Sequence, residues 1–272
     1  MNKGKININL ILGLILTGIV IIPAITGIFW TPYSTEAMDV SLKLSAPSIS
    51  HLLGCDNYGR DILSRLMAGS KITLIIGIGT VCFGCSIGTI VGAFTGYYGG
   101  RVDNVLMRIN DVLFSFPSIL LAMVFVSLTG AGNLQLIIAL GIAFIPSYAR
   151  VVRAEFIRNK NMDYVMAARL AGAGDFRIIF VHILPNTIKV LVSSILIGFN
   201  NAVLAEAGLS FLGIGVKPPE ASLGSMLSNA QTYLFSRPSM VVYPGVALIL
   251  MILGIALISK EIKKCHYFRS KI

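Results

Sequence analysis

Few side chains of this chain are placed to carry out covalent chemistry. The serine pair Ser193-Ser194 lies in an apolar run and has no base close to it in the sequence. The three histidines, His51, His182 and His266, stand in three separate polar segments. In the topology inferred below, these segments are an outer loop, an inner loop and the tail, so the three rings cannot meet. A Gly-rich phosphate-binding loop of the Walker type is also missing from the sequence, and we therefore expect neither enzymatic activity nor ATP hydrolysis from this chain.

The four cysteines are the candidates for metal binding. Cys82 and Cys85 form a C-x-x-C pair, but they stand in an apolar run and have no histidine or carboxylate near them in the sequence. Cys55 lies alone in a loop and Cys265 alone in the tail. A soft-metal site at the pair is one interpretation. We favour the other, in which both are small apolar side chains packed in a helix, and we expect no metal site and no disulfide framework.

Glu206 is the only acidic residue well inside a long apolar run. A carboxylate within a membrane span is a functional candidate by default. It can contact a solute, or it can hold its helix in place by bonding to Asn200 or Asn201 of a neighbouring copy or partner, and we favour the second role. Asn200, Asn201 and Glu206 are therefore candidate pathway or helix-packing residues.

The composition shows which kind of protein must position these groups. Of 272 residues, 55% are hydrophobic and only 12% are charged, and the mean hydropathy is +0.82. Soluble domains carry about 25% charged residues, so this chain is an integral membrane protein that contacts lipid. Its net charge of +10 does not indicate nucleic-acid binding, because the basic residues flank the apolar runs and such an excess marks the cytoplasmic side of membrane proteins.

Six apolar runs are long enough to cross a membrane as helices. They are residues 8–30, 72–98, 112–129, 134–149, 187–212 and 241–259. The first is too long for a signal peptide and lacks a small-x-small cleavage site, so we expect it to remain as a span. Glycines recur every fourth residue in the second run, which predicts close packing against another helix; they are Gly84, Gly88, Gly92 and Gly96.

Three of the segments between these runs are long, at 31–70, 150–186 and 213–240, and the others are short. Residues 31–70 read as an outer loop that ends in an amphipathic helix, residues 99–111 as a short turn, and residues 213–240 as an outer segment with a helical piece at 223–234. The predicted fold is an all-α polytopic membrane protein of six helices. Its parts are a first helix and outer loop (1–70), a transmembrane core (71–259) with an inner loop at 150–186, and a tail (260–272).

The positive charges predict the orientation. Fifteen Lys and Arg residues lie in the N-terminal segment, 99–111, 150–186 and the tail, against six in the two outer segments when Lys71, at the edge of the first, is included. Because basic loops stay in the cytoplasm, both termini and the loop at 150–186 are predicted to be cytoplasmic.

The polar stretch 163–186, DYVMAARLAGAGDFRIIFVHILPN, is the most distinctive part of the chain. Its first half reads as a short helix in which Tyr164, Ala167, Ala168 and Ala171 share one face. Three of these four are alanines, so the face is a smooth ridge that a groove on another protein could admit closely. Gly172 is placed to end this helix in the left-handed conformation.

The second half of this stretch reads as another short helix. We expect Asp163 and Asp175 to act as N-caps of the two helices, and Pro185 to stop the second. The apolar side of the second helix is expected to hold Phe176, Ile179, Phe180 and Ile183.

The spacing of this stretch resembles the EAA loop of ABC-transporter permeases. The family pattern of two alanines, three residues, a glycine and a later Leu-Pro is met by Ala167-Ala168, Gly172 and Leu184-Pro185. Met166 stands in place of the family's leading Glu, and His182 in place of an Ile. Two further stretches resemble the peptide/nickel permease subfamily. They are HLLGCDNYGRDILSRLMAG, with Cys55 where Thr is usual, and AEAGLSFLGIGVKPP followed by LGSMLSNAQTYL.

The resemblance implies the permease subunit of a peptide or nickel ABC importer in a bacterial cytoplasmic (inner) membrane. It implies a coupling loop formed by Tyr164, Ala167, Ala168, Ala171, Gly172, Leu184 and Pro185. It also implies three kinds of protein partner: a homologous second permease, two cytoplasmic ATPase subunits that carry ATP and Mg, and an extracellular or periplasmic solute-binding protein. No cofactor is expected on this chain itself. A homodimeric pore stays open on the sequence alone, and the tail KEIKKCHYFRSKI departs from the subfamily's usual ending.

Two other functions remain as alternatives. A proton- or ion-coupled secondary transporter needs buried titratable groups and usually carries internal repeats; the sequence offers only Glu206 and no repeat. A membrane scaffold without transport leaves the 163–186 stretch unexplained.

Overall fold

A computed structural model describes residues 8–269, and all regular elements in this range are helices. Residues 1–7 and 270–272, which include Lys3, Lys5 and the end of the basic tail, lie outside the described residues. The long helices are α1 (Ile8–Phe29), α2 (Ile62–Tyr98), α5 (Asn133–Asn159), α8 (Leu184–Phe211) and α10 (Ser239–Arg269). The shorter elements are η1 (Val40–Leu42), α3 (Gly100–Phe114), α4 (Ser118–Thr129), α6 (Asp163–Leu170), α7 (Asp175–Arg177), η2 (Ile178–Ile183), α9 (Leu223–Ala230) and η3 (Gln231–Tyr233).

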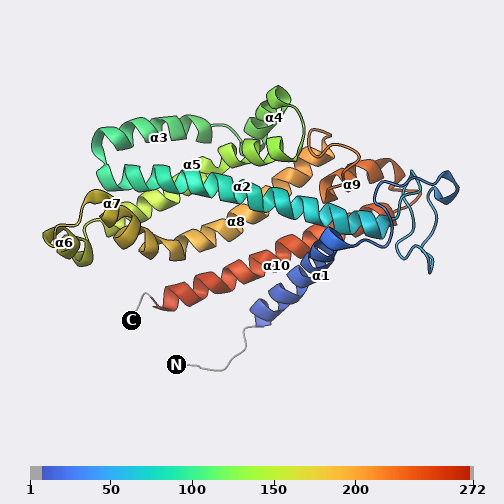
Figure 1. The fold of residues 1–272 in the computed structure, drawn as a ribbon, viewed down its shortest axis with the longest axis horizontal. Coiled ribbons are helices and arrows are strands. Elements are labelled where there is room, and N and C mark those ends of the chain that lie inside the picture. The colour runs from blue at the N-terminus through green and yellow to red at the C-terminus, as the bar shows by residue number, and fades with distance from the viewer. Residues whose placement is uncertain (1–7, 270–272) are drawn as a thin grey trace.

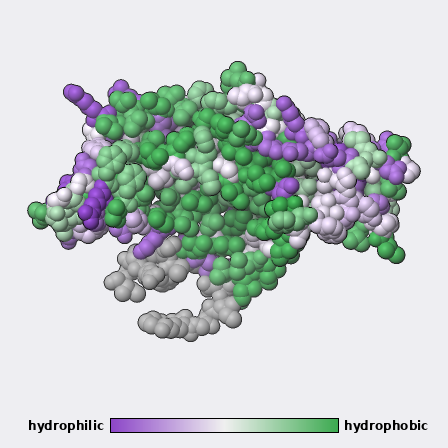
Figure 2. Space-filling view, in the orientation of Figure 1, coloured by the Kyte–Doolittle hydropathy of each residue, from purple (hydrophilic) through white to green (hydrophobic). Residues whose placement is uncertain are grey.

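The long helices lie along the longest axis of the molecule, with α6 and α7 at one end and α9 and the loop before α2 at the other (Figure 1). Hydrophobic residues dominate the middle of the face seen in Figure 2, and hydrophilic residues gather toward its two ends. Within residues 8–269, five helices are long and apolar enough to cross a membrane, and the count is six if the bent pair α3–α4 is one broken span. This is the predicted multi-span helical fold.

Helices α2 and α5 form the most extensive helix pair, and the predicted glycine stripe lies between them. A Cβ atom on Gly84 would lie 2.8 Å from the carbonyl oxygen of Gly141, and one on Gly96 would lie 2.5 Å from the Cβ of Phe156. Neither distance leaves room for a side chain. The stripe therefore allows the two backbones to meet, as the four-residue repeat predicted.

The turn predicted at 99–111 is wrong, because this segment is most of helix α3. Its charges suggested an exposed turn, but two of them bind α5: Asp103 pairs with Arg153 at 2.6 Å and Asp111 with Arg150 at 2.7 Å.

The third apolar run is also shorter than predicted, since α4 begins at Ser118 after an 86° bend. Pro117 stands at that bend as the residue before α4, where its fixed φ and missing N–H disfavour a continuous helix.

Two other boundaries differ from prediction because helices continue past the apolar runs. The amphipathic helix expected at the end of the first outer loop is the first part of α2, which starts at Ile62. The Asp61 carboxylate caps this start by accepting a 2.8 Å hydrogen bond from the Ser64 N–H. Helix α5 likewise continues to Asn159, ten residues beyond the predicted end at 149. The helical piece predicted at 223–234 is confirmed as α9 and η3.

Candidate functional site

Helix α6 presents the predicted alanine ridge to solvent. Its only buried residue is Val165, which packs in a cluster with Val152, Phe156 and Ile178. Ala167 and Ala171 are exposed and Ala168 is partly exposed. A single buried anchor thus fixes the helix while its small-residue face stays uncovered by the rest of the described chain.

Tyr164, the fourth member of the predicted face, has a different environment from the alanines. Its hydroxyl donates a 3.1 Å hydrogen bond to the Asn159 side-chain carbonyl at the end of α5. About a third of the side chain remains exposed, at 37%. It therefore fixes α6 to α5 and also borders the exposed face.

Gly172 adopts the predicted left-handed conformation, with φ of +82°. The Ala173 N–H donates to the Ala168 carbonyl at 3.0 Å, and the Gly172 N–H donates to the Arg169 carbonyl at 2.9 Å. This pair of bonds is the Schellman arrangement that satisfies the last carbonyls of a helix. A Cβ atom at Gly172 would meet no other atom within 4 Å, so the positive φ, and not crowding, is what favours glycine here.

The predicted N-caps and helix stop of this stretch need correction. Met162 and Gly174 are the capping residues, and Asp163 and Asp175 are the first residues of α6 and α7. Their carboxylates still lie in the first turn, where the helix dipole favours negative charge.

Pro185 does not end a helix, because one continuous helix runs from Asp175 to Phe211. The turns before the proline, η2, are π-helical, and the Leu184 N–H donates to the Ile179 carbonyl five residues back. These wider turns directly precede Pro185, which is the second residue of α8. The proline has no N–H to donate to the helix. Leu184 and Pro185 thus lie within the continuous helix that leads into the membrane span.

The second half of the stretch buries only part of its predicted apolar side. Ile179 and Ile183 are fully buried, together with Ile178, whereas Phe176 and Phe180 are exposed. The two exposed rings stack on each other with centroids 6.2 Å apart, and Phe176 also meets Phe94 edge-on at 6.3 Å.

Tyr97, at the end of α2, joins the two halves of the stretch. Its hydroxyl donates to the Asp175 carboxylate at 2.6 Å and accepts from the Arg169 guanidinium at 3.3 Å. The same guanidinium lies over the Tyr97 ring, 5.5 Å from its centroid. A displacement of α6 or α7 would therefore be transmitted to α2 as well as to α8.

Glu206 is fully buried and bonded within this chain. Its two carboxylate oxygens accept from the hydroxyls of Thr73 at 3.0 Å and Ser210 at 2.7 Å. Those hydroxyls in turn accept from the backbone N–H groups of Leu223 and Val216, each at 3.2 Å. The carboxylate thus connects α8 to α2 and to the segment that leads into α9, which is the geometry of a packing residue.

Asn200 and Asn201 lie near the middle of α8 and do not contact Glu206. The Asn200 side-chain amide donates to the Ile252 carbonyl of α10 at 3.2 Å. Asn201 is exposed on the same helix. Both side chains border a hollow between α8 and α10.

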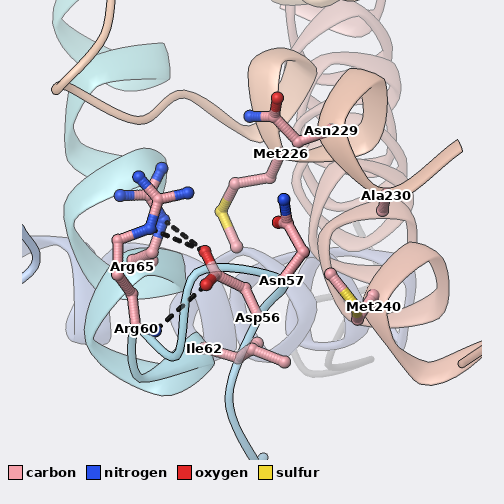
Figure 3. Close-up of a pocket in the computed structure, with 9 residues that line it drawn as sticks. All are labelled: Asp56, Asn57, Arg60, Ile62, Arg65, Met226, Asn229, Ala230 and Met240. Carbon is pink, nitrogen blue, oxygen red and sulfur yellow. Dashed lines mark hydrogen bonds and ion pairs between the residues drawn. The ribbon is translucent and has the colours of Figure 1, made fainter. Parts of the chain in front are cut away.

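The outer loop contains a buried ionic cluster that the sequence motif did not explain. Asp56 pairs with Arg60 at 2.8 Å and with Arg65 at 3.6 Å, in a small pocket closed by residues of α9 and α10 (Figure 3). The Arg65 guanidinium also donates to the Thr35 carbonyl at 2.9 Å. The D-x-x-x-R-x-x-x-x-R spacing was the available signal, but it does not reveal that the three groups are buried together.

The surroundings of Cys55 and Asp39 in the outer loop shift the pKa values of their side chains. Burial raises the pKa of the Cys55 thiol, so this thiol stays protonated and reacts slowly. Hydrogen bonds from the Ser41 hydroxyl and N–H lower the pKa of the Asp39 carboxyl. Among the described residues, His, Cys, Asp and Glu form no group of three that could hold a metal ion.

These features together define a class of protein. A multi-span helical bundle carries an exposed small-residue loop on a helix that continues into a membrane span. This is the design of a membrane permease that works with partner proteins.

The comparisons with known proteins place the chain within that class. Residues 88–264 match the family of binding-protein-dependent transport system inner membrane components, and the chain belongs to this family. It is thus the permease component of a binding-protein-dependent importer.

Individual relatives cover almost the whole chain. The glutathione transport system permease protein GsiD of Pectobacterium atrosepticum is 37% identical, over 90% of this chain and 83% of its own length. The dipeptide transport system permease protein DppC of Haemophilus influenzae is 35% identical over 95% and 90%. The nickel transport system permease protein NikC of Escherichia coli is 33% identical over 93% and 91%.

The fold is also similar to that of a solved permease. A chain of the inward-facing MetNI methionine ABC transporter aligns with a TM-score of 0.60 at 21% identity, covering 74% of this chain and 95% of the other. At this identity the likeness concerns the fold alone.

Proposed function

We propose that this chain forms half of the translocation pathway of an ABC importer for peptides or nickel and metal complexes. Two cytoplasmic ATPase subunits, which carry ATP and Mg, a homologous second permease and an extracellular or periplasmic solute-binding protein complete the transporter. The relatives named for glutathione, dipeptide and nickel transport support this range of solutes.

In this proposal the face of Tyr164, Ala167, Ala168 and Ala171 docks into a groove of the ATPase. The observation that carries it is the exposed alanine ridge on a helix fixed at Val165 and ended by the left-handed Gly172. Leu184 and Pro185 belong to the continuous helix that links this loop to the span. A movement of the ATPase would therefore displace this helix and, with it, α8.

The proposed orientation places α6, α7 and both termini in the cytoplasm of a bacterial inner membrane. The distribution of Lys and Arg supports it. Thiol labelling of intact cells tests it: a membrane-impermeant reagent should modify Lys217→Cys and leave Arg158→Cys unmodified. Modification of Arg158→Cys from outside would overturn the orientation and the docking role with it.

Docking itself is tested by enlarging one alanine. Ala168→Leu should leave the protein at normal abundance in the membrane but reduce co-purification of the ATPase and ATP-dependent uptake, because overpacking a close contact costs ~1–3 kcal/mol. Ala154→Leu is the control, since Ala154 is an exposed helical alanine that lies on α5, outside the ridge. If the Ala168 variant keeps its ATPase and its uptake, the proposed docking is wrong.

A further inference from the structure

A hollow of about 340 Å³ lies between α8 and α10. Its lining combines apolar and polar side chains: Ile197, Asn200, Asn201, Ala256, Ser259 and Lys260. Lys263 also borders it, and the same lysine borders a second hollow of about 830 Å³. Tyr164, Lys189 and Ser193 belong to the second lining. The two hollows thus follow α8 from its middle to the loop of α6.

The first hollow begins deep within the span. Asn200 is bonded to Ile252, and these residues lie near the middles of α8 and α10. Lys260 and Lys263 follow Ile252 by two to three helical turns, which is roughly 12–16 Å along the helix at 1.5 Å per residue. The hollow therefore connects mid-membrane depth with the end of α10 that we propose is cytoplasmic.

Lipid is a poor occupant for this surface. Asn201 is exposed, and the side-chain oxygen of Asn200 is buried without a hydrogen-bond partner in the part of the chain that the structure describes. An amide group left unpaired in hydrocarbon is costly. The exposed faces of α1 and α4 differ, since large exposed side chains at their middles, such as Ile19 and Val124, are aliphatic. Lysines near the end of a span also suit lipid headgroups. The asparagines, and not the lysines, therefore distinguish this surface from one that faces lipid.

We propose that the α8–α10 groove is this subunit's wall of the solute pathway. The exposed amide of Asn201 can donate to and accept from the amide groups of a peptide-like solute, and Lys189 and Lys263 can attract its carboxylate at the inner end. This assignment rests on the proposed function, because the groove leads to the loop that is proposed to contact the ATPase. It identifies the favoured solute as one with amide and carboxylate groups.

Thiol reactivity in the complete transporter tests the assignment. Inverted membrane vesicles would carry Asn201→Cys in a background without the native cysteines, and the probe would be a charged, membrane-impermeant methanethiosulfonate. Only a thiol in contact with water ionises and reacts, so Asn201→Cys should react at least ~10-fold faster than Ile19→Cys. Ile19 is the matched control, because it lies at the middle of α1 and its side chain is 54% exposed.

The outcomes separate this inference from the proposed function. If Asn201→Cys reacts as slowly as Ile19→Cys, lipid or a partner helix covers the groove and the assignment is wrong. If it reacts fast and the rate changes with ATP and vanadate, both the wall and its coupling to an ATPase are supported. If it reacts fast but the rate does not change with nucleotide, the groove is supported as the wall of the solute pathway, and its proposed coupling to an ATPase is wrong. Ala256→Cys, a small substitution in the same hollow, repeats the test should the Asn201 variant accumulate poorly.

Discussion

Thr73 in α2 donates a 3.0 Å hydrogen bond to the buried carboxylate of Glu206 in α8, across 133 residues of sequence. The same hydroxyl accepts from the Leu223 N–H at the start of α9. One threonine thus links a carboxylate within a span to the backbone of an outer segment. Both carboxylate oxygens of Glu206 therefore have hydrogen-bond partners within the described chain.

The first prediction is that Glu206 acts through stability. Glu206→Gln should lower the free energy of unfolding by ~1 kcal/mol, because the amide nitrogen cannot accept from one of the two hydroxyls. Glu206→Ala should cost ~2–4 kcal/mol, since it also leaves a cavity. Thermal unfolding in detergent would measure both losses. A fall in the transport rate per folded molecule, with unchanged unfolding, would instead support a solute- or proton-handling role.

The second prediction concerns the buried cluster of the outer loop. Asp56→Ala should destabilise the protein by ~3–5 kcal/mol, because it leaves two buried guanidinium groups, Arg60 and Arg65, without their carboxylate. Asp39→Ala in the same loop is the control, and its loss should be much smaller because Asp39 is exposed and bonded only locally to Ser41. Equal protease sensitivity of the two variants in the outer loop would contradict this ranking.

The sequence predicted features that depend on local spacing. Helical periodicity placed Ala167 and Ala171 on one exposed face, and glycine's tolerance of positive φ located the end of α6 at Gly172. The glycine repeat of α2 likewise predicted a close helix contact, because a four-residue period keeps one face free of side chains.

Features that depend on distant partners could not be predicted. Asp103 and Asp111 looked like charges of an exposed turn, but they bind Arg153 and Arg150 of α5, which are 50 and 39 residues away. The partners of Glu206 were missed for the same reason. Pro185 was misinterpreted because the preceding π-helical turns, which depend on the buried isoleucines of η2, carry the helix past it.

The third prediction is that Cys82 and Cys85 pack and do not bind metal. Cys82 is exposed on α2, whereas Cys85 is buried and its sulfur lies 3.8 Å from the Thr89 hydroxyl. The double Cys→Ala variant should keep its transport rate and lose at most ~1 kcal/mol of stability, from the small volume removed at Cys85. Uptake assays with radioactive nickel and with a labelled dipeptide would check this. A selective loss of nickel uptake at normal protein abundance would support the soft-metal interpretation.

The last prediction compares two glycines on either side of Ala173. Gly172 has a φ of +82°, whereas Gly174 has the ordinary extended values of −72° and 162°. Neither position is crowded, since a Cβ atom on either residue would meet nothing within 4 Å. An alanine at each position therefore adds the same atom and differs in backbone strain. At Gly172 that strain is ~1–2 kcal/mol, and at Gly174 only a modest N-cap preference of ~0.5 kcal/mol is lost.

The strain at Gly172 falls on the cap of α6 and not on a membrane span, so both variants should insert and accumulate normally. We expect Gly172→Ala to weaken ATPase co-purification and ATP-dependent uptake, and Gly172→Val to weaken them further, because the Ala168 end of the ridge is held by the bonds around this glycine. Gly174→Ala should retain both properties. If the two alanine variants behave alike, the left-handed cap does not set the docking geometry. If the Gly172 variants disappear from the membrane while Gly174→Ala persists, the cap serves folding and its proposed part in coupling is wrong.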